Sequence, residues 1–492
     1  MRNIVTGPVF LLLALAPALP AQSVANGFDA QLFAPADVDD MDVFGGITPA
    51  TGDVDEDGRA DLVGPGVGPF EVVRFLGQPG GGLGDKQIVV LPADVGAFVQ
   101  PLLGDLDGDG YLDLLARGTV TNLASFLHGA GNGSFGAGSA AASFPPSSYL
   151  AQLADLDEDG VLDVVFAVGG APTHVLHWMR GHGDGTFGAA TPIGPAVAPT
   201  GLIVADLDGD ALPDVACLDA QQVAVRHGLG GGAFAPPQLW SGFAFSGPDA
   251  ADMDLDGALD LLHVAGNDVG AILHGLGAGG FGEALYVQLA PFTHNLRAVD
   301  LERDGLPDLL GLGGLSAVVL AQRMDRDGPI GAPASTPLPG GGAAGILVHA
   351  DFDGDGLQDA ASTDLTSFKL VSLTNALGPF VDLGLGIPSV QGGAHLQGFG
   401  VPQPGSAVSV QVTCPAFAPG LLVGGLTALD APFGGSTFVP DAGFVVPVAG
   451  VVSLGGTWPA GYPAGVPLYL QSVHPILGGG KVISNALMIV PE

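Results

Sequence analysis

Two residue classes are scarce in this sequence, and each scarcity narrows the class of protein. The 492 residues include only two cysteines, Cys217 and Cys414, and no C-x-x-C spacing, which argues against a disulfide scaffold and a cysteine metal or redox site. The two cysteines fall in different expected domains, so we do not expect them to pair. Only 13 Lys and Arg accompany 50 Asp and Glu, for a net charge of −37. The basic patches that bind nucleic acid are therefore missing.

Helical and catalytic patterns are scarce as well. No stretch sustains a 3.6-residue apolar period with helix caps. The sequence contains no G-x-S-x-G elbow, no H-E-x-x-H helix and no G-x-x-x-x-G-K-[ST] phosphate loop. Its many G-x-G triplets are expected in hairpin turns. These absences predict a protein that is not an enzyme.

Glycine, apolar residues and aspartate are abundant instead. With 82 Gly, 40 Pro and 47% hydrophobic residues, the chain favours short strands joined by many turns. Aspartate recurs in a nine-residue frame that begins at Asp53, Asp105, Asp155, Asp206, Asp252, Asp300 and Asp351, at spacings of 52, 50, 51, 46, 48 and 51 residues. A period near 50 residues indicates supersecondary units that are stacked or arranged radially.

The chemistry of this frame points to calcium. Carboxylates at positions 1, 3 and 5 of a tight loop can turn toward one centre, and calcium takes six to eight oxygen ligands. Position 6 requires a positive φ, which glycine provides without steric cost. We expect position 7 to contribute a backbone carbonyl and position 9 to close the site. The loops hold 30 of the 50 acidic residues, so most of the acidity belongs to these candidate sites.

The candidate ligands fall into seven sets, one for each loop. They are Asp53, Asp55, Asp57, Arg59 and Asp61; Asp105, Asp107, Asp109, Tyr111 and Asp113; Asp155, Asp157, Asp159, Val161 and Asp163; Asp206, Asp208, Asp210, Leu212 and Asp214; Asp252, Asp254, Asp256, Ala258 and Asp260; Asp300, Glu302, Asp304, Leu306 and Asp308; and Asp351, Asp353, Asp355, Leu357 and Asp359. Each set is expected to hold one calcium ion, up to seven in all.

The seven loops resemble the calcium loops of FG-GAP repeats, also called VCBS repeats, which are known from the seven-bladed propeller of integrin α-subunits. The resemblance covers roughly residues 44–385. It implies an exported, calcium-binding adhesion or binding module of the secreted bacterial type.

The repeats themselves predict propeller blades. Each unit has an apolar strand, the acidic loop, two further strands, a turn and a fourth strand. The turn is rich in Gly and ends in an aromatic residue, as in G-A-G-N-G-S-F at 129–135, but the sixth and seventh units lose this pattern. Four antiparallel strands form one blade, and seven blades lie in the usual range. Residues 28–33 or residues 380–385 are expected to supply the strand that closes the ring.

The copies are not equivalent. Ala211 replaces glycine in the fourth loop, while the sixth loop has Glu302 at position 3 with the cation Arg303 beside it. We therefore expect weaker calcium sites at the loops that start at Asp206 and Asp300.

Three histidines, His128, His227 and His274, precede Gly-rich turns, and His182 lies within another such turn. They could bind a metal or a polar ligand as a ring of imidazoles, but we expect strand-end residues without a partner. Similarly, Trp178 and Trp240 are expected to pack in the core rather than to bind sugar.

The expected fold class is all-β, a seven-bladed β-propeller followed by a small β-sandwich. Residues 1–21 read as a signal peptide, with Arg2 before a short apolar run. Residues 22–387 are expected to form the propeller. Residues 388–492, where the period stops and short apolar runs alternate with Gly and Pro, are expected to form the sandwich.

These features predict a secreted or cell-surface protein without a membrane span after signal cleavage. Its expected partner is an extracellular protein or glycan. A propeller enzyme acting on polysaccharide, as a lyase or hydrolase, is the alternative, and a cell-surface architectural protein is a third, weaker one.

Overall fold

The computed structural model contains two separate units, and each is described by itself. One unit comprises Ala25–Leu301 and Leu306–Ala376, and the other consists mainly of Leu377–Glu492. The structure describes residues 14–15, 33–39, 48–66, 68, 70–79, 82–169, 174–196, 199–218, 222–241, 248–266, 268–277, 279–289, 293–301, 305–313, 318–325, 328–329, 333–338, 344–354, 356–364, 369–375, 380–382, 395–400, 407–413, 419–425, 428–433, 436–440, 444–449, 452–457, 468–475 and 481–489. No helix among these residues is long and apolar enough to cross a membrane.

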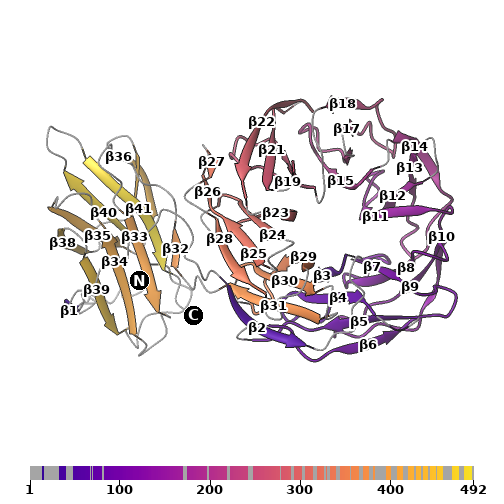
Figure 1. The fold of residues 1–492 in the computed structure, drawn as a ribbon, viewed down its shortest axis with the longest axis horizontal. Helices are drawn as coiled ribbons and strands as arrows, with labels where there is room; N and C mark the ends of the chain where they lie inside the picture. Colours follow the sequence, from indigo (N-terminus) through magenta and orange to yellow (C-terminus); the bar gives the residue numbers. More distant parts are fainter. Residues whose placement is uncertain are drawn as a thin grey trace, which may run out of the picture. The chain divides into compact units, whose positions relative to one another are not determined.

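The first unit is a ring of seven four-stranded antiparallel sheets (Figure 1), as the repeat predicts. Blade one contains β3 (Ala50–Gly52), β4 (Asp61–Pro65), β5 (Glu71–Phe75) and β6 (Gln87–Val90). Blade two contains β7 (Val99–Gly104), β8 (Asp113–Gly118), β9 (Leu123–Leu127) and β10 (Ser139–Ser143). Blade three contains β11 (Ser148–Ala154), β12 (Asp163–Val168), β13 (His174–Met179) and β14 (Thr191–Ala196).

The remaining blades follow the same order. Blade four contains β15 (Gly201–Ala205), β16 (Asp214–Leu218), β17 (Gln222–Arg226) and β18 (Gln238–Ser241). Blade five contains β19 (Asp249–Ala251), β20 (Asp260–Val264), β21 (Val269–Gly275) and β22 (Phe281–Gln288). Blade six contains β23 (Thr293–Val299), β24 (Asp308–Gly313), β25 (Val318–Gln322) and β28 (Ala334–Pro337), with the small hairpin β26 (Met324–Asp325) and β27 (Gly328–Pro329) beside it. Blade seven contains β29 (Ala344–Ala350), β30 (Asp359–Asp364), β31 (Lys369–Asn375) and β2 (Phe33–Asp39).

The N-terminal strand β2 closes the ring. It pairs with β31 as the outer strand of blade seven, from Phe33 opposite Asn375 to Asp39 opposite Leu370. The N-terminal alternative is therefore right, although the strand lies just after residues 28–33. The alternative at residues 380–385 is wrong, because β32 (Phe380–Asp382) pairs instead with β41 (Lys481–Ile489). Ring closure is completed between blades seven and one, where the Ala60 N–H donates to the Asp351 carbonyl at 2.8 Å.

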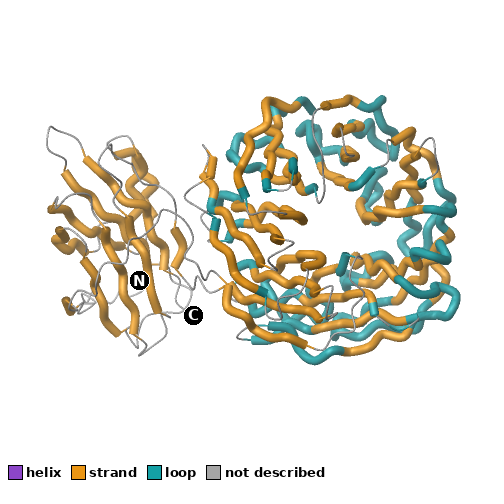
Figure 2. The backbone as a smooth tube through the Cα atoms, viewed as in Figure 1, coloured by secondary structure: helices purple, strands orange, loops and turns teal. Residues whose placement is uncertain are grey.

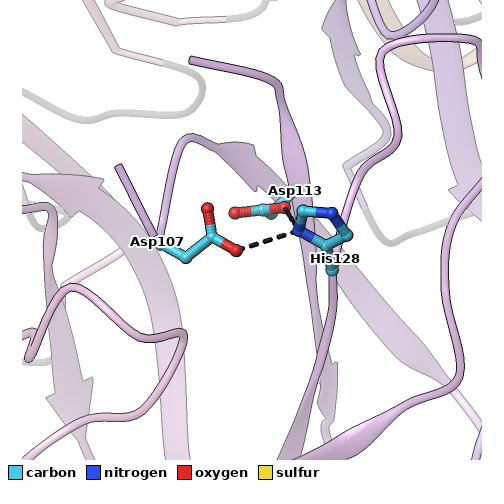
Figure 3. A group of neighbouring side chains, drawn as sticks. All are labelled: Asp107, Asp113 and His128. Carbon is cyan, nitrogen blue, oxygen red and sulfur yellow. Dashed lines mark hydrogen bonds and ion pairs between the residues drawn. The ribbon is translucent and has the colours of Figure 1, made fainter. Parts of the chain in front are cut away.

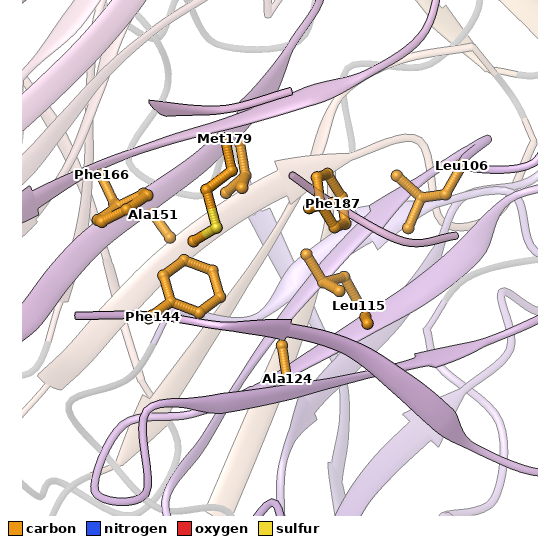
Figure 4. Packing of buried hydrophobic residues seen from close by; sticks show 10 residues of the cluster. Leu106, Leu115, Ala124, Phe144, Ala151, Phe166, Met179 and Phe187 are labelled. Carbon is orange, nitrogen blue, oxygen red and sulfur yellow. The ribbon is translucent and has the colours of Figure 1, made fainter. Parts of the chain in front are cut away.

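The core lies between neighbouring blades. In most blades the second strand begins with the position 9 aspartate and continues mainly with apolar residues, and β8, β16 and β24 are buried along their whole length. Such runs suit strands that are covered on both faces. Between blades two and three, Leu115 of β8 and Phe166 of β12 pack with Phe144 and Phe187 (Figure 4). Each blade therefore buries its faces against its neighbours, as radial repeats require.

The second unit is also all-β. Its described elements are strands (Figure 2). One sheet has the order β1-β39-β34-β33, a second has the order β32-β41-β40-β35-β38, and β36 and β37 form a small two-stranded sheet; all of these pairs are antiparallel. The further strands are β1 (Ala14–Leu15), β33 (His395–Gly400), β34 (Ala407–Thr413), β35 (Pro419–Gly425), β36 (Ala428–Phe433), β37 (Ser436–Pro440), β38 (Phe444–Ala449), β39 (Val452–Thr457) and β40 (Leu468–Pro475). Two sheets match the expected sandwich. Strand β1 lies within the expected signal peptide, residues 1–21, and pairs with β39. Signal cleavage stays a prediction.

In blades two, three and four, the Gly-rich turn joins the blade to the blade before it. Gly133, Gly185 and Gly232 donate their N–H to the carbonyls of Val54, Leu106 and Leu156 in the preceding acidic loop, at 2.9, 3.0 and 3.1 Å. A Cβ atom on Gly232 would lie only 2.2 Å from the Trp178 ring, whose indole is thereby packed between blades three and four. The expectation that Trp178 is a packing residue is confirmed. So is that for Trp240, whose ring meets Phe281 edge-on at 5.0 Å.

We expect the substitution Gly232→Ala to lower the free energy of unfolding by about 3 kcal/mol, because it adds a clash to a backbone at φ +72°. The matched control is Gly231→Ala, where φ is +62° but nothing lies within 4 Å of the new Cβ. The control is expected to cost about 1 kcal/mol, and urea unfolding measures both. Equal losses would contradict the tight contact between blades.

Candidate metal centre

Each acidic loop is anchored by one apolar side chain that is buried in the core. Position 2 is occupied by an apolar residue that is at most 3% exposed in every copy: Val54, Leu106, Leu156, Leu207, Met253, Leu301 and Phe352. Leu106 belongs to the core cluster between blades two and three (Figure 4). This anchor holds the loop on the blade edge, so that positions 1, 3 and 5 turn the other way.

The aspartate at position 9 holds the loop closed. In all seven copies it is at most 2% exposed. One oxygen accepts the N–H of position 2, and the other accepts an N–H where the third strand ends. For Asp163 the donors are Leu156 at 2.9 Å and Gly181 at 2.7 Å. Position 9 is therefore a structural fastener, and its expected role as a calcium ligand stays a prediction.

The carboxylate at position 1 organises the upper part of the loop. In the second loop, Asp105 accepts the N–H groups of Gly108 at 2.7 Å and Gly110 at 3.0 Å. Asp109 at position 5 accepts the N–H of Tyr111 at 2.9 Å. Position 7 is therefore held through its N–H, while its expected carbonyl ligation stays a prediction. These bonds curl the loop so tightly that its carboxylates face one another.

Positions 1, 3 and 5 converge as the frame predicts. In the first two loops, one oxygen from each of the three aspartates lies within 4.8 Å of the oxygens of the other two. The sets are Asp53, Asp55 and Asp57, and Asp105, Asp107 and Asp109. Three carboxylates so close together repel one another unless a cation lies between them.

Among the described residues of the acidic loops, two buried carboxylate oxygens lack a hydrogen-bond partner. They are Oδ1 of Asp55 and Oδ1 of Asp157, both at position 3. The Asp157 side chain is only 8% exposed. A buried, charged oxygen without a donor is costly, and a metal ion in the loop would remove that cost. The residues present therefore fit a hard divalent cation.

Left-handed backbone occurs at two positions of the loop. Position 6 has positive φ in the described copies, including Ala211 at φ 70°, which confirms the expected strain there. Position 4 is left-handed as well, for example at Glu56, Glu158 and Leu255 with φ of 58°, 62° and 58°. The sequence pattern does not predict left-handed backbone at position 4, although Gly108, Gly209 and Gly354 occupy this position in three copies. The non-glycine residues there store strain in the loop.

The sixth and seventh loops are described only in part. Glu302, Arg303, Asp304 and Asp355 lie outside the described residues. Asp351 accepts the N–H groups of Gly354 and Gly356, both at 2.7 Å, and therefore repeats the turn of the second loop. Asp308 and Asp359 act as fasteners like their counterparts.

A basic side chain, histidine or arginine, faces the loop in several blades. The residue that follows the third strand is His128 in blade two, where Nδ1 lies 2.9 Å from Asp107 and 3.6 Å from Asp113 (Figure 3). His227 lies 3.3 Å from Asp208 and 3.2 Å from Asp214. His274 lies 3.5 Å from Asp254 and 3.4 Å from Asp260. The expectation that these histidines lack partners is wrong, because each imidazole faces the acidic loop of its own blade.

Blade three has arginine at the same position. Arg180 Nε lies 2.9 Å from Asp157, and its Nη2 lies 2.5 Å from Asp159. This bond lowers the pKa of Asp159 and raises that of Arg180. His182 is not equivalent to the other three histidines, since its Nδ1 contacts Thr186 at 3.0 Å. In blade one the cation comes from position 7 instead, where Arg59 contacts Asp57.

Burial shifts the protonation of the fasteners. It raises the pKa of both Asp61 and Asp163 to about 6, against their two backbone N–H bonds, and raises the pKa of Asp113 and Asp260 in the same direction. The hydrogen bond that its ring donates to the Asp107 carboxylate raises the pKa of His128. Without a metal ion the loops therefore favour protonation.

This shift predicts how the metal-stripped protein responds to pH. Because the folded state of Asp61 and Asp163 binds a proton at a higher pH than the unfolded state, their ionisation costs stability as the pH rises through about 6. We expect the stripped protein to gain roughly 3 kcal/mol of stability between pH 7.5 and pH 4.5. Urea unfolding across that range measures it, and a steady loss of stability on acidification would contradict the prediction.

Comparisons with known proteins agree with the repeat. A family model described as the FG-GAP-like repeat matches residues 105–166, 155–217 and 206–263. No curated protein matches the chain.

Several solved structures are similar to this chain at low sequence identity. A lectin of Agrocybe aegerita, solved for its recognition of non-reducing terminal N-acetylglucosamine, is 20% identical with a TM-score of 0.49, over 60% of this chain and 80% of the lectin. The Photorhabdus luminescens Tc holotoxin pore is 15% identical with a TM-score of 0.38, over 87% and 22% of the two chains. Raptor of Chaetomium thermophilum is 12% identical with a TM-score of 0.43, over 70% and 30%.

Proposed function

We propose that this chain, an FG-GAP repeat β-propeller, binds calcium in its acidic loops and acts as a non-catalytic binding module for an extracellular protein or glycan. The observation that carries the proposal is the convergence of the carboxylates at positions 1, 3 and 5. The buried, unpartnered oxygens of Asp55 and Asp157 support it, because they need a cation.

Calcium is the ion that this donor set favours. The three loop aspartates offer only oxygen, and calcium accepts six to eight oxygen ligands in flexible geometry. Magnesium demands a near-ideal octahedron and keeps several waters. The loop backbone leaves the rims of the sites exposed, at Asp57 and Asp109 for example, so water can complete the shell.

The loops differ in what calcium must displace. In blade three, the Arg180 guanidinium lies across Asp157 and Asp159, but its side chain is 55% exposed and can swing into solvent. In blade one, Arg59 competes for Asp57 in the same way. Loops one, two, three, five and seven remain the expected firm sites, and the loops that start at Asp206 and Asp300 remain the expected weaker ones.

A rigid ring suits a binding module. Polar side chains on the innermost strands bond to the backbone of the next blade: Gln100 to Ala151 at 3.1 Å, Gln152 to Leu202 at 2.9 Å and Asn295 to Gly345 at 3.1 Å. These groups stitch the blades together and are thereby occupied. The assignment as a module rather than an enzyme rests on this use of polar groups and on the missing catalytic patterns.

A binding array with glycans and extracellular proteins tests the proposal. The full chain is applied in calcium and after calcium removal, and the matched control is the double substitution Asp105→Asn and Asp107→Asn in one calcium loop. We expect binding to members of one class, either glycans or extracellular proteins, and only when calcium is present. Turnover of a polysaccharide on the array, or no ligand in either condition, would contradict the proposed function.

A further inference from the structure

The imidazoles of blades two, four and five have a different chemistry from the calcium set. Each lies opposite the carboxylates of positions 3 and 9, and in blade two Nε2 of His128 also lies 3.7 Å from Asp109 at position 5. In each of the three blades, one imidazole nitrogen and two carboxylate oxygens lie within 4.8 Å of one another. The groups are Asp107, Asp113 and His128; Asp208, Asp214 and His227; and Asp254, Asp260 and His274.

We infer that these three Asp-Asp-His groups are transition-metal sites of the zinc class, distinct from the calcium sites of positions 1, 3 and 5. Imidazole nitrogen together with carboxylate oxygen suits zinc and its neighbours, whereas calcium prefers oxygen alone. The inference goes beyond the proposed calcium binding: the group shares the carboxylates of positions 3 and 9 with the expected calcium ligands, and adds an imidazole where calcium would use positions 1 and 5.

The distances in blade four fit a tetrahedral metal. Zinc binds nitrogen and oxygen at about 2.0–2.2 Å, so two ligand atoms of a tetrahedral site lie about 3.3–3.5 Å apart. In blade four, His227 Nδ1 is 3.3 Å from Asp208 and 3.2 Å from Asp214. In blade five the corresponding distances are 3.5 and 3.4 Å. Three protein ligands leave a fourth position for water.

One imidazole nitrogen in these groups faces its carboxylates without a hydrogen bond. His274 Nδ1 is buried and makes no hydrogen bond, although it lies 3.5 and 3.4 Å from the two carboxylates. His227 is only 8% exposed, and its Nδ1 lies between Asp208 and Asp214 with one hydrogen bond, to Asp214 at 3.2 Å. A single N–H cannot serve two carboxylates well, whereas one metal ion can bind all three groups.

The carboxylates are already held in place for this role. The oxygens of Asp214 accept the N–H groups of Leu207 at 2.9 Å and Gly228 at 2.7 Å. Hydrogen bonds of this kind orient metal ligands.

Zinc binding by the full chain tests the inference. The metal-stripped protein is dialysed against Zn²⁺ alone, and the bound metal is counted by mass spectrometry. The substitution His227→Arg copies the natural Arg180 of blade three, so it keeps a basic side chain beside the carboxylates and removes the ligand nitrogen. We expect it to lower the count by one zinc per chain. The reverse change, Arg180→His, is expected to raise the count by one, and this gain cannot arise from misfolding.

A third variant separates this site from the calcium site. Asp206→Asn removes the position 1 ligand of the fourth loop and leaves Asp208, Asp214 and His227 in place. We expect it to reduce calcium binding and to leave the zinc count unchanged. The inference is overturned if neither His227→Arg nor Arg180→His changes the number of zinc ions bound per chain, or if Asp206→Asn lowers that number. Failure of calcium binding alone would contradict only the proposed function.

Discussion

Removal of divalent cations with a chelator will lower the melting temperature of the full chain by roughly 15 °C. Each ion bound only by the folded state adds about 2.7 kcal/mol when its free concentration is 100 times the dissociation constant, so several loops together add a large total. Without ions, the converging carboxylates of each loop repel one another, and the turn between the first two strands of each blade loses its fixed centre.

Calorimetry in excess calcium and in EDTA measures this shift. Magnesium in place of calcium is the control, and it is expected to restore only a small part of the loss. Readdition of calcium should restore the original melt. A melting temperature that is the same with and without the chelator would contradict calcium binding in the loops.

The second large effect concerns the fastener and does not depend on metal. The substitution Asp163→Ala is expected to lower the free energy of unfolding by about 4 kcal/mol, because it leaves the N–H groups of Leu156 and Gly181 buried without acceptors. The loss should persist in EDTA.

The matched control in the same loop is Asp155→Asn at position 1. It retains an acceptor oxygen for one of the N–H groups of Asp159 and Gly160, so in EDTA we expect a loss below about 1 kcal/mol. In calcium its stability should fall further, since it lacks a ligand. If Asp163→Ala left the free energy of unfolding unchanged in EDTA, the metal-independent structural role of Asp163 would be wrong.

Much of the fold follows from short-range patterns. The recurring aspartate frame predicts the number of blades, and the spacing near 50 residues leaves room for four strands in each. The need for positive φ at position 6 is also local, so the strain at Ala211 was visible in the sequence and is confirmed by its φ of 70°. The apolar runs after each loop correctly predict strands buried on both faces.

The rest depends on contacts between distant residues. Asp113 bonds to Gly129 and contacts His128, and neither partner is marked in the frame itself. The repeat spacing relates the histidines to one another across the ring, but it does not show that each lies beside the aspartates of its own blade. Ring closure could not be decided either, because both ends of the propeller offered a short apolar segment. Only the pairing of β2 with β31 resolves it.

The most direct test of the account is a crystal structure of the full chain grown in calcium, with anomalous difference density measured for the bound ions. The account predicts a peak among the carboxylates of positions 1, 3 and 5, at Asp105, Asp107 and Asp109 for example. Loops whose carboxylates turn apart into solvent, with no peak between them, would contradict it.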